Sequence, residues 1–288
     1  MLEPSEETPP FDFVTLEHGK VHYRLQGAPG SPLVVLVHGM GVPLFVWEPL
    51  SNVLREHGYR TLRFDLYGRG YSDKPDIPNT PALFETQLFQ LLEALELRAS
   101  FHLIGSSMGG AICVQFSCSY PEKIRSLTLV SPAGAKLAMP WTSKVLQIKL
   151  VGELIPRGLA RRTYLSKIRE NFFYESLTSR FVERLSHQME HPGFFESLLS
   201  TLRHFPLSDM EEAYRALAEL SIPTLLLWGT DDKIVPYDNH TAVLATNPGV
   251  SFHTIVECGH IPHYEKTEEV SALVLPFLQE NSTDRAQG

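Results

Sequence analysis

A serine flanked by glycines lies where the chain should turn from a strand into a helix. The segment Gly105-Ser106-Ser107-Met108-Gly109 follows the apolar residues 101–104 and opens a helical pattern over 108–120. In a G-x-S-x-G turn the central hydroxyl is exposed, and the free N–H groups at the helix start face an anion that develops there. We therefore expect Ser107 to be a nucleophile, with Ser106 as the competing hydroxyl.

A serine hydroxyl reacts readily only when a base removes its proton. His260 follows Cys258-Gly259, just past the expected strand 251–256, which would place its imidazole over the strand ends. We expect His260 to be this base. His263 is the rival, although it is better suited to supporting the loop by hydrogen bonding.

The imidazole in turn needs a carboxylate that fixes its tautomer. Two neighbouring aspartates, Asp231 and Asp232, follow the expected strand 223–228, and Asp232 precedes the apolar Ile234-Val235. The segment after the strand 124–130 offers no carboxylate. We favour Asp232, with Asp231 as the alternative, which gives the chain order serine, aspartate, histidine.

A glycine-rich segment, His38-Gly39-Met40-Gly41, follows the expected strand 33–37. Glycines there let the backbone approach an acyl oxygen closely. We expect the N–H groups of Met40 and Met108 to form an oxyanion hole, with His38 bracing the loop.

Two further acids, Asp65 and Asp73, flank the turn Gly68-Arg69-Gly70. We interpret them as stabilising the turn and pairing with Arg69 rather than as a metal site. The sequence shows no metal-ligand spacing, dinucleotide fingerprint or phosphate loop, so the expected chemistry uses no metal and no cofactor.

Strands and helices are expected to alternate along most of the chain, as in a mostly parallel sheet with helices on both faces. After a hairpin at 13–25, the expected strands are 33–37, 61–66, 101–104, 124–130, 223–228 and 251–256. The expected helices are 47–57, 81–97, 108–120, 237–245 and 268–279. The predicted fold class is therefore α/β, with the candidate catalytic side chains just after strands.

Residues 135–220 interrupt this alternation with helical patterns and no clear apolar strand, which predicts a helical lid between two parts of the core, 1–134 and 221–288. Within the lid, Phe172, Phe173 and Phe194 are candidates for lining an apolar substrate pocket, and packing of the lid on the core is the alternative.

The lid also differs in charge from the rest of the chain. Residues 136–203 contain eleven basic and six acidic residues, although the whole chain has a net charge of −8. This excess would suit an anionic substrate or peripheral contact with an anionic membrane, but a solvated basic face is the simpler interpretation.

Composition excludes several other classes of protein. The net charge of −8 argues against a nucleic-acid partner. No apolar run approaches the length of a membrane span, and the first residues lack the pattern of a signal peptide. Three cysteines without framework spacing indicate free thiols, so we expect a cytoplasmic location.

Taken together, the segments resemble the α/β-hydrolase superfamily, in the branch with a helical lid. The matching pieces, in the order that the superfamily requires, are 38–41, 65–73, 105–110, 228–236 and 259–263. The resemblance implies that fold and a serine hydrolase of the carboxylesterase or monoacylglycerol lipase type. Ser107 stands where epoxide hydrolases and haloalkane dehalogenases carry an aspartate, which argues against both.

We therefore expect first the hydrolysis of carboxylic esters with a moderately apolar acyl group, through an acyl-enzyme. C–C bond hydrolases of diketones are similar at every motif, but they usually carry an asparagine where Ser106 stands, so we rank them second. A third hypothesis is a ligand-sensing module that keeps the three side chains and turns over slowly.

Overall fold

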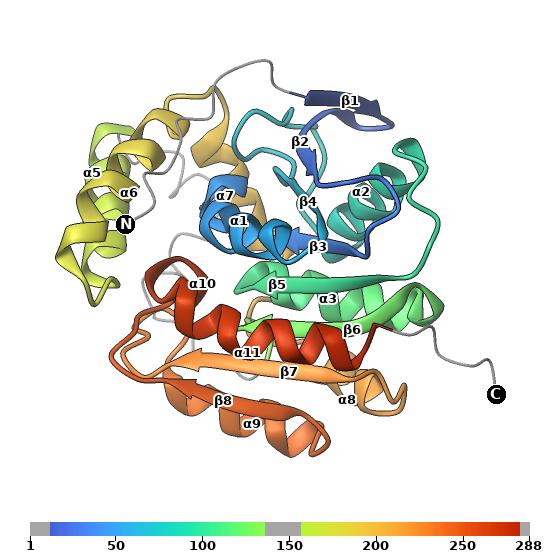
Figure 1. The fold of residues 1–288 in the computed structure, drawn as a ribbon. Helices are drawn as coiled ribbons and strands as arrows, with labels where there is room; N and C mark the ends of the chain where they lie inside the picture. The colour runs from blue at the N-terminus through green and yellow to red at the C-terminus, as the bar shows by residue number, and fades with distance from the viewer. Residues whose placement is uncertain (1–11, 136–156, 283–288) are drawn as a thin grey trace.

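The computed structural model describes residues 12–135 and 157–282. Eight strands form one sheet in the order β1-β2-β4-β3-β5-β6-β7-β8, which runs through the centre of the molecule (Figure 1). The strands are β1 (Asp12–Leu16), β2 (Gly19–Gln26), β3 (Leu33–Val37), β4 (Arg60–Phe64), β5 (Phe101–Ser106), β6 (Ile124–Val130), β7 (Thr224–Gly229) and β8 (Ser251–Ile255). In this spatial order, all neighbouring strands from β4 through β3 to β8 are parallel, while β2 pairs antiparallel with both β1 and β4. The predicted mostly parallel sheet is therefore confirmed.

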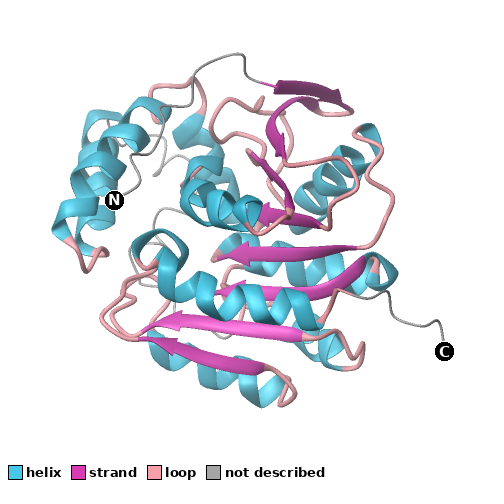
Figure 2. Cartoon of the chain, viewed as in Figure 1, coloured by secondary structure: helices cyan, strands magenta, loops and turns pink. Residues whose placement is uncertain are grey.

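Helices cover both faces of this sheet (Figure 2). The helices that follow the strands are η1 (Leu44–Trp47), α1 (Glu48–Glu56), α2 (Pro81–Ala94), α3 (Met108–Ser119), η2 (Pro121–Lys123), α8 (Glu211–Ala218), η3 (Tyr237–Asn239), α9 (His240–Thr246), α10 (Pro262–Glu265) and α11 (Thr267–Glu280). α1 and α11 pack in one core cluster, and α2, α3, α8 and α9 contribute to the other. Because both faces are covered, every residue of β3, β5 and β7 is buried, as the unbroken apolar run of β3 predicts for that strand.

Three further helices lie between β6 and β7: α5 (Arg157–Glu170), α6 (Glu175–Gln188) and α7 (Phe194–His204). In Figure 1, α5 and α6 lie beyond the arrowheads of the parallel strands, so we call α5, α6 and α7 the lid. Residues 136–156 of the expected helical lid lie outside the described residues. The assignment of 135–220 to a separate lid domain stays a prediction.

Two helices of eight or more residues were not expected from the sequence, α5 and α8. Leu165 is the only buried residue of α5, which carries five basic residues, so it shows little apolar periodicity. α8 is only eight residues long, and it packs against α3 and α9 of the core rather than on the lid. Among the described residues no helix has the length and apolar content that a membrane span requires.

Candidate active site

Ser107 occupies a strained position between β5 and α3. Its backbone has φ +55° and ψ −124°, a conformation that few residues other than glycine adopt. The flanking glycines are needed because a Cβ at Gly105 would lie 2.5 Å from Cys113 Sγ, and one at Gly109 would lie 2.2 Å from the Val37 carbonyl oxygen. Ser106 is 2% exposed at the end of β5. The turn therefore presents Ser107, rather than Ser106, toward the loops that follow the strands.

Asp232 and His260 are brought together at the same end of the sheet. The Nδ1 of His260 lies 2.7 Å from Asp232 Oδ2, and the carboxylate is almost completely buried. The other carboxylate oxygen, Oδ1, accepts hydrogen bonds from the N–H groups of Ile234 and Val235, both at 2.9 Å. The aspartate is thus held by its own loop while it orients the imidazole, with Nδ1 as the donor and Nε2 left for a proton acceptor role.

The two rival residues have different surroundings. Asp231 is exposed and accepts a hydrogen bond from Thr230 Oγ1 at 2.7 Å. The imidazole of His263 is fully buried and stacks on Trp47 with ring centroids 3.9 Å apart. Burial lowers the pKa of His263 to about 3, with nearby His260 adding to the effect. His263 therefore supports its loop as a neutral, stacked ring and not through the hydrogen bond that we expected.

In the described part of the chain, no hydrogen bond joins Ser107 to His260. Such bonds in free enzymes are often long and form only when substrate is bound. Both side chains follow strands of the parallel part of the sheet, β5 and β8, whose carboxyl ends point the same way (Figure 1). The structure thus places the three candidate side chains on loops at the same end of the sheet, after β5, β7 and β8, and links Asp232 and His260 directly.

The candidate oxyanion loop lies directly against Ser107. A Cβ at Gly39 would lie 3.1 Å from Ser107 Cβ, so the backbone that leads to Met40 passes close beside the serine. Met108 is the first residue of α3, and its N–H has no acceptor within that helix. These positions suit the two donors that the sequence predicts.

His38 fixes the orientation of this loop. Its Nδ1 donates to the Gly39 carbonyl at 2.8 Å, and its Nε2 accepts from the Leu66 N–H at 2.9 Å. Burial lowers the pKa of His38 to about 4, which keeps the ring neutral so that one nitrogen can accept. The Gly39 carbonyl and the Met40 N–H belong to one peptide plane, so His38 holds that plane in place.

Arg69, which the sequence suggested would pair with an aspartate, is a buried cation with other partners. Its Nε donates to the Met40 carbonyl at 2.6 Å, and its remaining nitrogens bond to the Tyr67 carbonyl and to Ser197 and Thr201 of α7. Burial lowers the pKa of Arg69 to about 10. The side chain therefore connects the candidate oxyanion loop to the lid, a role that no sequence motif indicates.

Asp65 is the partner of a different residue, His22. Its Oδ2 lies 2.6 Å from His22 Nδ1, and both side chains are buried. The carboxylate also accepts the N–H groups of Leu44 and Tyr71. The expected ion pair between Arg69 and an aspartate is thus wrong: Asp65 stabilises the turn through His22 and backbone donors.

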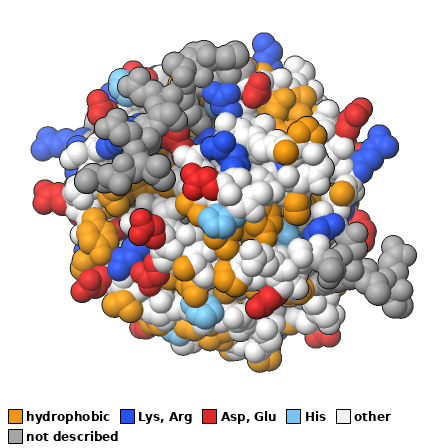
Figure 3. All heavy atoms as spheres, viewed as in Figure 1, with side chains coloured by type: hydrophobic (Ala, Val, Ile, Leu, Met, Phe, Trp, Pro, Cys, Tyr) orange, Lys and Arg blue, Asp and Glu red, His pale blue; other side chains and the backbone are white. Residues whose placement is uncertain are grey.

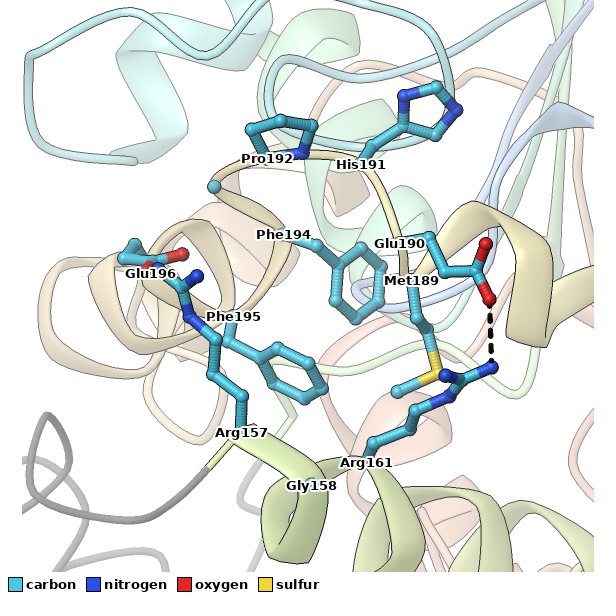
Figure 4. Close-up of a pocket in the computed structure, with 11 residues that line it drawn as sticks. Arg157, Gly158, Arg161, Met189, Glu190, His191, Pro192, Phe194, Phe195 and Glu196 are labelled. Atoms are coloured by element: carbon cyan, nitrogen blue, oxygen red, sulfur yellow. Dashed lines mark hydrogen bonds and ion pairs between the residues drawn. The ribbon is translucent and has the colours of Figure 1, made fainter.

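The three phenylalanines proposed for substrate binding have separate surroundings. Phe172 packs against Phe181 and Tyr264, and Phe173 is 44% exposed beside Tyr174. Phe194 lines a pocket of about 370 Å³ in the lid, and its ring points into this pocket together with that of Phe195 (Figure 4). A substrate-binding role for the three stays a prediction, and the structure does not gather them around one cavity.

Three basic residues of the lid, Arg157, Arg161 and Arg184, form ion pairs with acids. Arg157 pairs with Glu196 at 2.5 Å, and Arg161 pairs with Glu190 at 3.2 Å; all four line the pocket of Figure 4. Arg184 of α6 reaches the core at Glu48, also at 2.5 Å. On the face shown in Figure 3, basic and acidic side chains are interspersed over the lid. Membrane contact through this surface stays a prediction.

No group of three His, Cys, Asp or Glu side chains in residues 12–135 and 157–282 is arranged to hold a metal ion. The candidate site combines one hydroxyl, one imidazole, one carboxylate and backbone donors, which is the set of groups that acyl transfer through a serine requires.

Residues 32–267 match the family model described as alpha/beta hydrolase fold. The chain belongs to this family. A 2-hydroxy-6-oxononadienedioate/2-hydroxy-6-oxononatrienedioate hydrolase 2 of Pseudomonas putida is 33% identical over 272 residues, which is 90% of this chain and 92% of that protein. A hydrolase of the same substrate name from Paraburkholderia phymatum is 28% identical over 269 residues, 90% of this chain and 91% of that protein.

A solved structure is also closely similar. It is a hydrolase from Pseudomonas aeruginosa PA01 with a TM-score of 0.78 and 25% identity, covering 93% of this chain and 98% of that one. This similarity supports the α/β-hydrolase fold, in agreement with the family match.

These relatives correct the expected activity. We placed ester hydrolysis first and C–C bond hydrolysis second, because Ser106 replaces the asparagine usual in C–C hydrolases. The relatives from Pseudomonas putida and Paraburkholderia phymatum are named for 2-hydroxy-6-oxo acids and not for esters. The ester prediction is therefore wrong, the carboxylesterase or monoacylglycerol lipase type is not confirmed, and the residue at position 106 was a poor criterion.

Proposed function

We propose that this chain is a hydrolase that cleaves a C–C bond in a vinylogous diketone, a 2-hydroxy-6-oxo acid of the kind for which its relatives are named. The observation that supports this proposal is the buried His260–Asp232 hydrogen bond, on the loops that follow β8 and β7, beside the elbow that carries Ser107. The same groups that break an ester can break a bond next to a ketone, provided that the departing carbon is stabilised.

The substrate class supplies that stabilisation. When the 2-hydroxy group of a 2-hydroxy-6-oxo dienoate ketonises, its proton moves to carbon 5 and carbon 2 becomes a carbonyl carbon, as carbon 6 already is. A carbanion at carbon 5 is then conjugated, through the remaining double bond, with the carbonyl at carbon 2. The bond between carbons 5 and 6 is thus the one whose electron pair can leave.

In the first half of the proposed reaction, Ser107 Oγ adds to carbon 6 while His260 Nε2 takes the hydroxyl proton. The oxygen on carbon 6 becomes an anion, which the N–H groups of Met40 and Met108 stabilise. As this intermediate collapses, the bond between carbons 5 and 6 breaks, and its electron pair delocalises through the double bond onto the oxygen of carbon 2, which takes the proton from His260. A dienol acid departs, and Ser107 carries the remaining acyl group as an ester.

In the second half, water adds to this ester while His260 again takes a proton. Collapse of the second tetrahedral intermediate breaks the bond to Ser107 Oγ, and the proton returns to the serine. One water is consumed and a carboxylic acid leaves. Asp232 stays ionised and stabilises the protonated imidazole in both halves.

The test is turnover of 2-hydroxy-6-oxo-2,4-dienoates that differ in the substituent on carbon 6: alkyl, phenyl and carboxyalkyl. We expect wild-type protein to consume at least one of them, to release the two acids in equal amounts, and to place one ¹⁸O atom from labelled water in the acid derived from carbon 6. Folded Ser107→Ala should lose at least about a thousand-fold in kcat, as removal of a serine nucleophile generally does.

A p-nitrophenyl ester panel serves as the comparison. Higher kcat/KM on every ester than on any dienoate would contradict the proposal. A single slow turnover, together with a large rise in Tm on ligand binding, would favour the ligand-sensing alternative instead.

The chain has no disulfide among its cysteines, Cys113, Cys118 and Cys258, which supports the proposed cytoplasmic location.

A further inference from the structure

The turn between α5 and α6 of the lid contacts the loop that carries Asp232. The Asn171 side chain, 6% exposed, accepts a hydrogen bond through Oδ1 from the N–H of Lys233 at 3.1 Å. The Lys233 ammonium in turn donates to the Glu170 carbonyl at 3.2 Å. Lys233 is the residue directly after Asp232, so the lid holds the aspartate loop at the peptide next to the carboxylate.

The same turn also contacts the loop that carries His260. Glu265, 8% exposed, accepts the N–H of Phe173 at 2.8 Å through Oε2 and the N–H of Gly259 at 3.1 Å through Oε1. A Cβ at Gly259 would lie 1.8 Å from the Asn171 carbonyl oxygen, so only glycine lets the two backbones approach this closely. Gly259 is the residue directly before His260.

From these contacts we infer that Asn171 and Glu265 are positioning residues, which use the lid turn to hold Asp232 and His260 at the separation their hydrogen bond requires. The inference rests on the proposed catalytic roles of that pair. Neither residue touches the reacting atoms, and each acts one residue away from a member of the pair.

The physical reason is the separate origin of the two loops. Asp232 follows β7 and His260 follows β8, and the core joins their loops by few bonds, such as that from the Asp231 N–H to the Cys258 carbonyl at 2.9 Å. The turn between α5 and α6 adds one hydrogen bond to the Asp232 loop, through Asn171, and one to the His260 loop, through the Phe173 N–H. A displacement of the turn therefore moves both loops, and misplacement by about 1 Å is enough to lower a rate a hundred-fold.

The experiment compares Asn171→Leu, Glu265→Gln and Glu265→Ala with wild type on a dienoate that wild type turns over. Asn171→Leu keeps the size of the side chain and removes the acceptor, whereas Glu265→Gln keeps one acceptor oxygen of two. We expect kcat to fall about ten- to a hundred-fold in Asn171→Leu and Glu265→Ala, and less in Glu265→Gln, with KM within about three-fold of wild type.

Two further readouts separate positioning from a general loss of structure. The low-field proton resonance of His260 Nδ1–H should broaden in the variants, because the proton exchanges with water when the pair loosens. The matched control is Thr178→Val, which removes a buried hydrogen bond from Thr178 Oγ1 to the Tyr174 carbonyl within the lid and touches neither loop. It should keep kcat and the resonance while losing some Tm.

The outcomes are distinguishable from failure of the proposed function. Wild type that neither turns over a dienoate nor reacts with a fluorophosphonate at Ser107 contradicts the function itself. Active wild type with unchanged kcat and a sharp resonance in both Asn171→Leu and Glu265→Ala overturns the positioning inference. If Asn171→Leu does not fold, the two Glu265 variants decide the matter alone.

Discussion

Asp231 and Asp232 are neighbours in the chain, but only Asp232 contacts His260. The Asp232 carboxylate is buried 2.7 Å from the imidazole nitrogen, and that of Asp231 faces solvent beside Thr230. The strand ends at Gly229, and the loop after it buries the third residue, Asp232, while leaving the second, Asp231, exposed.

This difference predicts opposite outcomes for two similar substitutions. Asp232→Asn should lower kcat by about three to four orders of magnitude, because an amide does not enforce the required tautomer or stabilise the imidazolium. Asp231→Asn should leave kcat within about two-fold. Steady-state kinetics on the best dienoate measures both, and equal losses in the two variants would contradict the assignment.

His263 predicts a specific pH dependence of stability. Its pKa is about 3 in the folded protein, against an ordinary value of 6.5, because the ring is buried as the neutral form. Below pH 6.5 the unfolded chain binds a proton that the folded chain does not, so the free energy of unfolding falls as the pH falls toward 3. One such group contributes a slope of about 1.4 kcal/mol per pH unit within that window.

His263→Phe removes this proton uptake and keeps a ring to stack on Trp47. We expect the free energy of unfolding of the variant to fall less than that of wild type, by about 2 kcal/mol, between pH 6.5 and pH 5. Urea denaturation at both pH values measures the difference. Parallel pH dependence in the two proteins would show that the imidazole is not kept neutral by burial.

Arg69 should couple the lid to the candidate oxyanion loop. Arg69→Met removes the donors to the Met40 carbonyl and to Ser197 and Thr201 and leaves these acceptors buried, which should cost about 2–4 kcal/mol of stability. We also expect kcat to fall about ten-fold or more, because the loop loses its brace.

Asn79→Ala is the comparison for Arg69→Met. It removes other bonds to Ser197 and Thr201 but has no bond to the oxyanion loop. If Asn79→Ala lowers kcat as much as Arg69→Met at equal loss of Tm, the hydrogen bond from Arg69 to the Met40 carbonyl does not contribute to catalysis.

Gly39 should tolerate no side chain. Gly39→Ala would place Cβ 3.1 Å from Ser107 Cβ, so the oxyanion loop must shift by a few tenths of an ångström. We expect kcat to fall about ten- to a hundred-fold in a protein that still folds. Gly249→Ala is the control, because its nearest neighbour would be Asn247 Oδ1 at 3.7 Å. An active Gly39→Ala would argue that Met40 does not serve as a donor.

Much of the fold could be predicted because its signals are local. The unbroken apolar run of β3 marks a strand covered on both faces, and the glycines around Ser107 mark the turn between β5 and α3. α5 was not predicted because its sequence is basic and has few apolar residues, so it shows no clear helical pattern. These few apolar residues are packed by the lid and the core, and this packing cannot be recognised from the sequence of the helix. The activity was misjudged because ester and C–C hydrolysis by a serine use the same motifs, so the motifs alone do not separate them.

The sequence by itself determined which groups are available: a serine at a strained turn, an imidazole and carboxylates after strands, and glycines where backbones meet. Only the tertiary structure decided which of these side chains face one another, that is, Asp232 rather than Asp231 beside His260, Asp65 beside His22, and Arg69 between Met40 and the lid. The reason is that a motif fixes the conformation of a few consecutive residues, whereas a contact between distant loops depends on how the sheet, the helices and the lid pack.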